Sequence, residues 1–175
     1  KRSVVFLHVS AEENGIRGSE FYTNNPLYKL TNTIVNLNID MIGRIDPKRK
    51  NKNMDYIYLI GSDRLSQELH DISESVNNKT TKLYLDYKYN DPLDPNRFYK
   101  RSDHFHFVKN KIPAIFYFNG IHEDYHKPSD TAEKIEYDLL KDRIKLIFFT
   151  AWELANRYNR IEVDKNVDFR QVPIQ

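Results

Sequence analysis

Cysteine is missing from this 175-residue sequence, and further absences narrow what the protein can do. Without cysteine there are no disulfides and no thiolate metal ligands, so any zinc site must use His, Asp and Glu side chains. The 5 glycines form no phosphate-binding loop, and neither a Gly-x-Ser-x-Gly elbow nor a His-Glu-x-x-His motif occurs. No apolar run approaches the roughly 20 residues of a membrane span. These absences argue against a serine hydrolase and against a membrane-spanning protein.

A surplus of one charge is also missing. The chain has 27 Lys and Arg against 25 Asp and Glu, a net charge of +2, with both signs interspersed. The one basic tract, 48–52, lies in a predicted solvated loop, so the sequence does not predict nucleic-acid binding. Hydrophobic residues make up 39%, which is typical of a globular protein, and the length suits one domain with one core.

Strand-like and helical segments alternate along the chain. Runs rich in β-branched and aromatic residues predict strands over 3–10, 33–42, 56–61, 83–89 (at a sheet edge) and 112–118. Capping residues and helical spacing predict helices over 19–25, 65–76, 102–109 and 132–158, with Ser102 capping the third and Thr131 or Asp130 the last. The alternation predicts an α/β layered domain with a mixed, mostly parallel sheet.

Carboxylates occupy two strand ends of this predicted sheet, where ligands collect in α/β proteins. Glu12 and Glu13 are adjacent, and burying both would cost several kcal/mol unless a divalent metal binds one and leaves the other free as a base. Seen alone, such a pair is more often a solvated turn. Asp40 lies in an otherwise apolar strand, so its charge is paired, neutralised or metal-bound, or it caps the following turn.

Histidines follow the last predicted strand. His122 and His126 are candidate zinc ligands, because neutral imidazole binds zinc and often has a carboxylate such as Asp124 or Asp130 behind it. The competing interpretation is a polar loop with incidental histidines. The contiguous residues 102–104, Ser-Asp-His, point in different directions on one helix and cannot form a catalytic triad.

Four segments in order along the chain resemble one family, the co-catalytic dinuclear zinc aminopeptidases, whose relatives include aminopeptidase Y, glutamate carboxypeptidase II and the glutaminyl cyclases. The segments are 5–22 with Glu-Glu, 38–43 with Asp40, 101–107 with Ser-Asp-His followed by 111–114, and 124–131 with His126. The match covers most of the chain. The resemblance implies a three-layer α/β/α zinc-exopeptidase fold, with residues 1–175 forming the second half of a catalytic domain that is truncated at its N-terminus.

The resemblance also implies a role for each matching residue. Glu12 would be the general base, Glu13 and His126 would bind one zinc ion, and Asp40 would bind the other. Tyr99 matches the position of a tyrosine that steadies the tetrahedral intermediate in some members. Two Zn²⁺ ions would share a water that attacks the peptide carbonyl, so that N-terminal residues are removed from a peptide substrate.

The chain departs from the family pattern in one respect. The pattern needs a further His and a bridging Asp upstream of Glu12, and no segment of this sequence resembles them. Because the chain starts almost at the Glu-Glu strand, without a signal peptide or an initiator Met, we interpret it as an excised or processed piece. We expect this piece to bind zinc weakly or not at all, to be inactive alone, and to dimerise through exposed sheet edges.

Other functions fit the same residues. A non-catalytic, receptor-like binding module of the same fold would lose metal ligands, whereas Glu13, Asp40 and His126 are all present here. A glutaminyl cyclase would use one zinc ion. Family habit implies a periplasmic or extracellular parent protein. The sequence leaves open the metal, the preferred side chain, and the choice between amino- and carboxypeptidase action.

Overall fold

A computed structural model of the protein describes residues 1–50 and 53–167, and its described strands form one mixed sheet. The strands are β1 (Asn36–Ile39), β2 (Tyr56–Ile60), β3 (Tyr84–Asp86) and β4 (Ala114–Phe118), in the spatial order β1-β4-β2-β3. β1 pairs with β4 and β2 with β3 in parallel, whereas β2 and β4 are antiparallel. The predicted mixed sheet is therefore confirmed, with β3 at an edge as expected.

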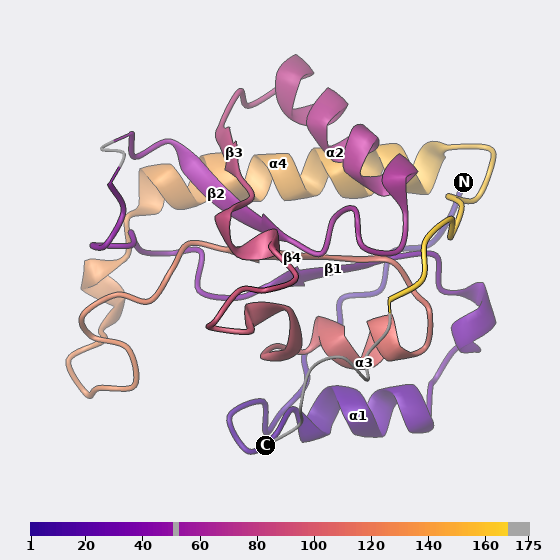
Figure 1. Ribbon diagram of the computed structural model, residues 1–175, viewed down its shortest axis with the longest axis horizontal. Coiled ribbons are helices and arrows are strands. Elements are labelled where there is room, and N and C mark those ends of the chain that lie inside the picture. Colours follow the sequence, from indigo (N-terminus) through magenta and orange to yellow (C-terminus); the bar gives the residue numbers. More distant parts are fainter. Residues whose placement is uncertain (51–52, 168–175) are drawn as a thin grey trace.

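Helices cover both faces of this sheet (Figure 1). The α-helices are α1 (Arg17–Asn24), α2 (Gln67–Lys79), α3 (His104–Lys109) and α4 (Tyr137–Asn156). Short 3₁₀ turns occupy Leu30–Asn32, Lys88–Asn90, Phe98–Lys100 and Ala132–Lys134. α2 and α4 lie on one face, and α1 and α3 on the other, which gives the three layers that the resemblance implies.

The pleat of the central strands divides the core into two parts. On β2, Ile57 and Leu59 face α2 and α4, where they pack with Leu69, Ile72, Leu146 and Leu154. Tyr56, Tyr58 and Ile60 face the other side and pack with Phe98, Val108, Phe116 and Phe118. β2 and β4 are buried along their whole length, as the continuous apolar runs predict.

Two predicted helix starts differ from the structure. Ser66 caps α2 by accepting a hydrogen bond from the Leu69 N–H at 3.2 Å, but Ser102 does not cap α3. α4 begins at Tyr137 rather than at 132, because Ile135 is extended (φ −70°, ψ 129°) and separates the Ala132–Lys134 turn from the helix. Neither Thr131 nor Asp130 therefore caps the long helix. Residues 51–52 of the predicted basic loop, and residues 168–175, lie outside the described ranges.

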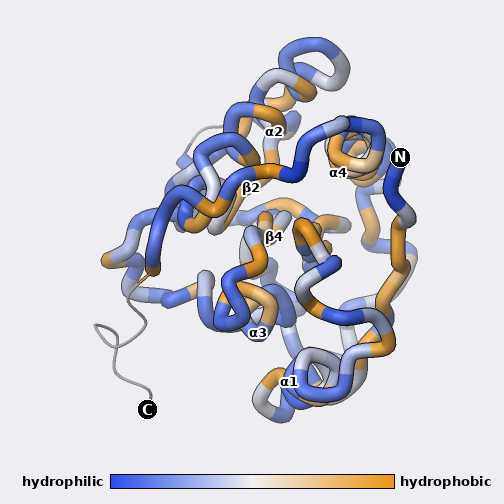
Figure 2. The backbone as a smooth tube through the Cα atoms, turned by 90° about the vertical axis from the view of Figure 1, so that its right-hand side faces the viewer, coloured by the Kyte–Doolittle hydropathy of each residue, from blue (hydrophilic) through white to orange (hydrophobic). Residues whose placement is uncertain are grey.

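The predicted first strand is also wrong. Residues 3–10 have strand-like composition, yet they form no strand, and Val5 and Phe6 remain 51% and 86% exposed. In Figure 2 this stretch runs from the N-terminus, beside the end of α4, along the outside of the molecule towards α1. A strand requires a hydrogen-bonded neighbour as well as β-forming side chains, and the described residues provide no neighbour for this run. No helix in the described part of the chain is long and apolar enough to cross a membrane.

Candidate functional site

The turns and loops after three strand-like segments bring four of the predicted site residues near one another, namely Glu12, Glu13, Asp40 and His126. Glu12 and Glu13 lie in a tight turn before α1, in which the Glu12 carbonyl accepts hydrogen bonds from the Gly15 and Ile16 N–H groups at 3.1 and 2.8 Å. Asp40 immediately follows β1. Burial, and then the charges of Asp40 and Glu13, raise the pKa of Glu12, so both carboxylates lie within electrostatic reach of Glu12.

His126 contacts this group directly. Its Nε2 lies 2.7 Å from Oε1 of Glu13, and both side chains are more than half exposed. The imidazole also stacks on the ring of the preceding Tyr125, with the ring centroids 3.7 Å apart. Burial, and then the negative charge of Glu13, raise the pKa of Tyr125. The predicted pair of Glu13 and His126 is thus in contact across 113 residues of sequence.

Glu12 has an electrostatic environment suited to a base. Partial burial raises its pKa from 4.5 to about 7, with further contributions from Asp40, Glu13 and Asp103 that Arg101 partly offsets. A carboxylate with a pKa near the working pH both accepts a proton readily and gives it up again. Ordinary surface glutamates do not have this property.

Asp40 is held by a short relay of hydrogen bonds. The Ser102 hydroxyl donates to Oδ2 of Asp40 at 3.0 Å, and the side-chain amide of Asn38 donates to the Ser102 hydroxyl at 2.9 Å. Burial raises the pKa of Asp40, and the Ser102 hydrogen bond acts against that rise. Ser102 therefore orients a candidate metal ligand. The sequence does not indicate this role, because a serine before a helix is usually a cap.

Asp103 is a further acidic neighbour that the sequence analysis missed. Its charge raises the pKa of both Glu12 and Asp40. Its Oδ1 is buried and has no hydrogen-bond partner within the described residues. The signal in the sequence is its place in the Ser-Asp-His segment, but only the fold shows that it faces two other carboxylates.

The backbone is unusual at each of the three site segments. Ala11, next to Glu12, has φ 58°; Met41, next to Asp40, has φ 56°; and His126 itself has φ 59°. Residues with a Cβ rarely adopt this left-handed conformation, which costs about 1–3 kcal/mol each at strained positions. Such strain is common where a backbone is held for function rather than for stability.

The hydroxyl of Tyr99 is buried and has no hydrogen-bond partner within the described residues. Its ring lies against Gly61, where an added Cβ would come within 2.5 Å of it, and Arg64 lies over its face at 5.2 Å. Burial raises the pKa of Tyr99, and the charged groups that act on it are Arg64 and Asp63. Its role towards a reaction intermediate stays a prediction.

The remaining polar residues of the last loop have structural contacts. Asp124, a candidate partner of His126, instead accepts from Arg44 at 2.9 Å, Lys134 at 2.7 Å and Ser129 at 2.7 Å, and these contacts hold its pKa well below the usual range. His122 is buried, with Nε2 3.7 Å from Asp130, and burial lowers its pKa. These contacts fix the loop that carries His126.

His104 packs rather than binds. It is fully buried and stacks on Phe116 with the ring centroids 4.9 Å apart, and burial lowers its pKa to about 3. Its imidazole is therefore neutral at physiological pH and serves as part of the core.

The donor set fits a divalent metal in its chemistry but is incomplete. Carboxylates with an imidazole beside them are the ligands that zinc uses in the absence of cysteine. Within residues 1–50 and 53–167, however, no three His, Asp or Glu side chains gather closely enough to hold an ion. Glu13 and His126 offer one pair of ligands, and Asp40 lies apart from that pair.

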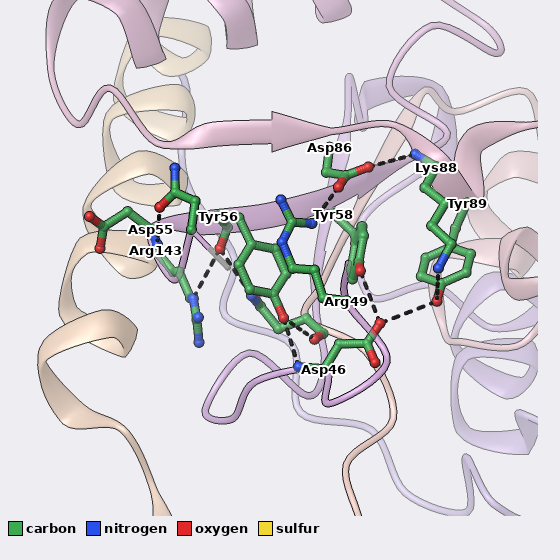
Figure 3. Close-up of polar contacts among 11 residues, drawn as sticks. Asp46, Arg49, Asp55, Tyr56, Tyr58, Asp86, Lys88, Tyr89 and Arg143 are labelled. Carbon is green, nitrogen blue, oxygen red and sulfur yellow. Dashed lines mark hydrogen bonds and ion pairs between the residues drawn. The ribbon is translucent and has the colours of Figure 1, made fainter. Parts of the chain in front are cut away.

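A second polar cluster, centred on Asp46, lies in the loop after β1 (Figure 3). The Tyr58 hydroxyl donates to Oδ2 of Asp46 at 2.9 Å, and the Asp46 N–H donates to the Tyr56 hydroxyl at 2.7 Å. The guanidinium of Arg49 stacks over the Tyr56 ring at 3.9 Å and pairs with Asp86. Protein donors thus satisfy the Asp46 carboxylate, whereas Nε and Nη2 of Arg49 are buried without a hydrogen-bond partner within the described residues.

Comparison with known proteins gives a family and a fold. The model of Peptidase family M28 matches residues 1–151. Among solved structures, the Legionella pneumophila LapA aminopeptidase superposes with a TM-score of 0.65 at 20% identity over 86% of this chain. BSAP, a zinc aminopeptidase from Bacillus subtilis, gives 0.65 at 21% identity over 90%. The aminopeptidase from Aneurinibacillus sp. strain AM-1 gives 0.61 at 23% identity over 92%. No curated protein sequence matches.

The chain spans well under half of these solved structures. It covers 38% of LapA, 37% of BSAP and 35% of the Aneurinibacillus aminopeptidase. At these identities the likenesses establish the fold alone.

Proposed function

The chain belongs to peptidase family M28, and on that basis we propose that it carries one part of the active site of a zinc-dependent aminopeptidase. The observation that carries the proposal is the acidic cluster at the end of β1, defined as Glu12, Glu13, Asp40 and Asp103. Burial, and then the charges of Asp40, Glu13 and Asp103, raise the pKa of Glu12, while burial and the charges of Asp103 and Glu13 raise the pKa of Asp40. His126 contacts Glu13. A divalent cation would convert this repulsion into attraction.

Each residue then has a distinct task. Glu13 and His126 would hold one zinc ion and Asp40 a second, with Ser102 fixing the carboxylate of Asp40 through its 3.0 Å hydrogen bond. Bound zinc lowers the pKa of water and polarises the scissile carbonyl. Glu12, with a pKa near 7, would take a proton from the attacking water and pass it to the departing amine. The substrate class is a peptide with a free amino terminus.

The chain by itself is expected to be inactive. Each ion would receive one or two ligands from it, whereas catalytic zinc sites have about three protein ligands. The test therefore uses a longer protein that contains this chain together with the upstream part of the domain. Release of N-terminal residues from short peptides is measured with and without a chelator, and again after zinc is restored.

The Glu12→Gln variant of that longer protein separates chemistry from binding. Loss of the base should lower kcat by about 10²–10⁴-fold, the range for general acid–base catalysis, while the zinc content stays unchanged. Full activity in this variant would refute the role of Glu12. Zinc binding without any hydrolysis in the unsubstituted protein would identify a non-catalytic member of the family instead.

A further inference from the structure

Arg44 connects the loop that carries Asp40 to the loop that carries His126. It follows Asp40 by four residues along the chain. Its Nη2 donates to Oδ2 of Asp124 at 2.9 Å, and its Nη1 donates to Oδ1 of Asp130 at 3.1 Å. Asp124 comes two residues before His126, and Asp130 comes four residues after it. One guanidinium therefore holds the His126 loop on both sides of the histidine.

The two contacts of Arg44 depend on the shape of its side chain as well as on its charge. Arg44 and Asp124 are mostly shielded from water, with side chains 16% and 7% exposed. Each terminal nitrogen of the planar guanidinium meets a different carboxylate, whereas the ammonium of a lysine has no rigid fork with which to match two separate carboxylates. An exposed ion pair contributes little, but a shielded bridge of this kind holds two segments in one arrangement.

The backbone of Arg44 is held from the other side, by α4. Nη1 of Arg143 donates to the carbonyls of Ile42 and Arg44 at 2.6 and 3.0 Å. Its Nε donates to the Tyr56 carbonyl at 3.3 Å, at the start of β2 (Figure 3). Arg143 is itself buried. The segment from Asp40 to Arg44 is thus anchored on a long helix, so the Arg44 side chain extends from a fixed point towards the other loop.

Both loops contain backbone that needs such support. Met41, beside Asp40, has φ 56°, and His126 has φ 59°. Residues with a Cβ keep this left-handed conformation only where the surrounding structure holds them in it. Consecutive turns also shape the second loop, and they are closed by the N–H groups of Tyr125, Lys127 and Asp130.

The two loops carry ligands for different ions in the proposed site. Asp40 would bind one zinc ion, and Glu13 with His126 would bind the other. Two ions act on one water only when they lie about 3.5–4 Å apart. The loops must therefore keep a fixed relation to each other, which the ligands alone cannot impose before any metal is bound.

We propose that Arg44 is a positioning residue, which sets the spacing of the two metal-binding loops by bridging Asp124 and Asp130. The role rests on the proposed function. Lys134 provides a matched comparison, because its Nζ lies 2.7 Å from Oδ1 of the same Asp124. It belongs to the turn that directly follows the His126 loop, so it neutralises the carboxylate without joining the two loops.

Zinc titration of the metal-free longer protein, which contains this chain and the upstream part of the domain, tests the role. Arg44→Lys keeps the charge and loses the bridge. The second zinc ion should then bind about 10–100-fold more weakly, the range for residues that orient metal ligands. Lys134→Met removes a cation from the same carboxylate and should leave the affinity for both ions nearly unchanged.

Hydrogen exchange of the same metal-free proteins provides a readout that involves no metal. The amides of Tyr125, Lys127 and Asp130 should exchange faster in Arg44→Lys than in the unsubstituted protein, and they should keep their rates in Lys134→Met. Faster exchange confined to these turns would also show that the variant still folds.

The possible results separate the role of Arg44 from the proposed function. If Arg44→Lys binds the second zinc ion as tightly as the unsubstituted protein, or if Lys134→Met weakens it equally, the positioning role is overturned and the proposed function stands. Unchanged exchange of the three amides in Arg44→Lys overturns the role as well. If the unsubstituted protein binds no zinc, the proposed function fails and the role of Arg44 fails with it.

Discussion

Two clusters of ionisable side chains lie close to β1, and they differ in whether the protein satisfies them. The Asp46 carboxylate is buried, 3% exposed, and accepts hydrogen bonds from the Tyr58 hydroxyl and the Lys48 N–H. In the acidic cluster, Glu12 and Asp40 face each other and Asp103 with the same charge. The Asp46 cluster is arranged for stability, whereas the acidic cluster leaves a repulsion that a cation would relieve.

The tyrosines beside Asp46 emphasise the contrast. Burial, and then the neighbouring carboxylate, raise the pKa of Tyr58 far above its ordinary value, so the hydroxyl remains a donor at any physiological pH. In the acidic cluster the main donor is the Ser102 hydroxyl, which serves Asp40 alone. The same residue type, an aspartate in the segment after β1, thus stabilises the fold as Asp46 and is held among like charges as Asp40.

The largest expected effect comes from removing the centre of the satisfied cluster. Asp46→Ala would leave the buried Tyr58 hydroxyl without its acceptor and should lower the free energy of unfolding by about 3 kcal/mol. Urea denaturation measures this change. Asp138→Ala is the control, since the Asp138 side chain is 99% exposed and the loss of its surface ion pair with Lys141 should cost less than about 1 kcal/mol. Equal effects of the two variants would mean that the Asp46 cluster does not stabilise the fold.

A finer test compares two hydroxyls on the same carboxylate. The Tyr58 hydroxyl lies 2.9 Å from Oδ2 of Asp46 and the Tyr89 hydroxyl 3.4 Å. Tyr58→Phe removes a good hydrogen bond to a charged group and should destabilise by about 2 kcal/mol, while Tyr89→Phe should cost clearly less. The same urea titrations rank the two variants. The reverse order would contradict the geometry of the cluster.

The sequence predicts the layers of this fold better than it predicts its polar clusters. The positions of β2, β4 and α2 could be predicted from short segments of sequence. In each segment the spacing of the apolar residues alone indicates the element and its buried face. The run 3–10 has the same composition as a buried strand and is exposed, because strand identity also depends on a neighbour that composition does not reveal.

The candidate site likewise contains some residues that the sequence predicts and others that it does not. Glu12, Glu13, Asp40 and His126 could be selected from motifs, and the fold places Glu13 against His126. Asp103 and the hydroxyl role of Ser102 could not be predicted, because they depend on α3 packing beside β1. The Asp46 cluster joins residues from the loop after β1, from β2 and from the turn after β3, a tertiary arrangement that leaves no local pattern.

A third prediction concerns the repulsion in the acidic cluster. The folded pKa of Glu12, about 7, lies above the ordinary value of 4.5, so the native state holds this proton more tightly than the unfolded chain does. The ionised side chain therefore lowers stability, fully above pH 7 and not at all below pH 4.5. Glu12→Gln should stabilise the metal-free chain by about 1 kcal/mol at high pH, a value reduced for solvent screening because the side chain is partly exposed.

Urea denaturation at several pH values checks this sign. The gain from Glu12→Gln should grow as the pH rises through the interval from 4.5 to 7 and then level off. Glu162→Gln, at an exposed position, provides the control for removing one charge. If Glu12→Gln instead lowers stability at high pH, the ionised Glu12 carboxylate is stabilised by protein contacts, as Asp46 is, and the repulsion is refuted.

The smallest effect on stability, and the most specific, is expected at Ser102. Ser102→Ala removes one hydrogen bond to Asp40 and one from Asn38. Ser102 is buried, but both partners are partly exposed and can bind water instead, so the free energy of unfolding should fall by less than about 1 kcal/mol. The pKa of Asp40 should rise further, because the hydroxyl no longer stabilises its charged form while burial still opposes it. NMR titration of the Asp40 carboxyl carbon measures that shift, and Ser129→Ala, which removes a hydroxyl from Asp124 instead, should leave it unchanged. An Asp40 titration indifferent to Ser102 would mean that the relay only packs α3 against β1, and that the protein does nothing to keep this carboxylate charged for a metal.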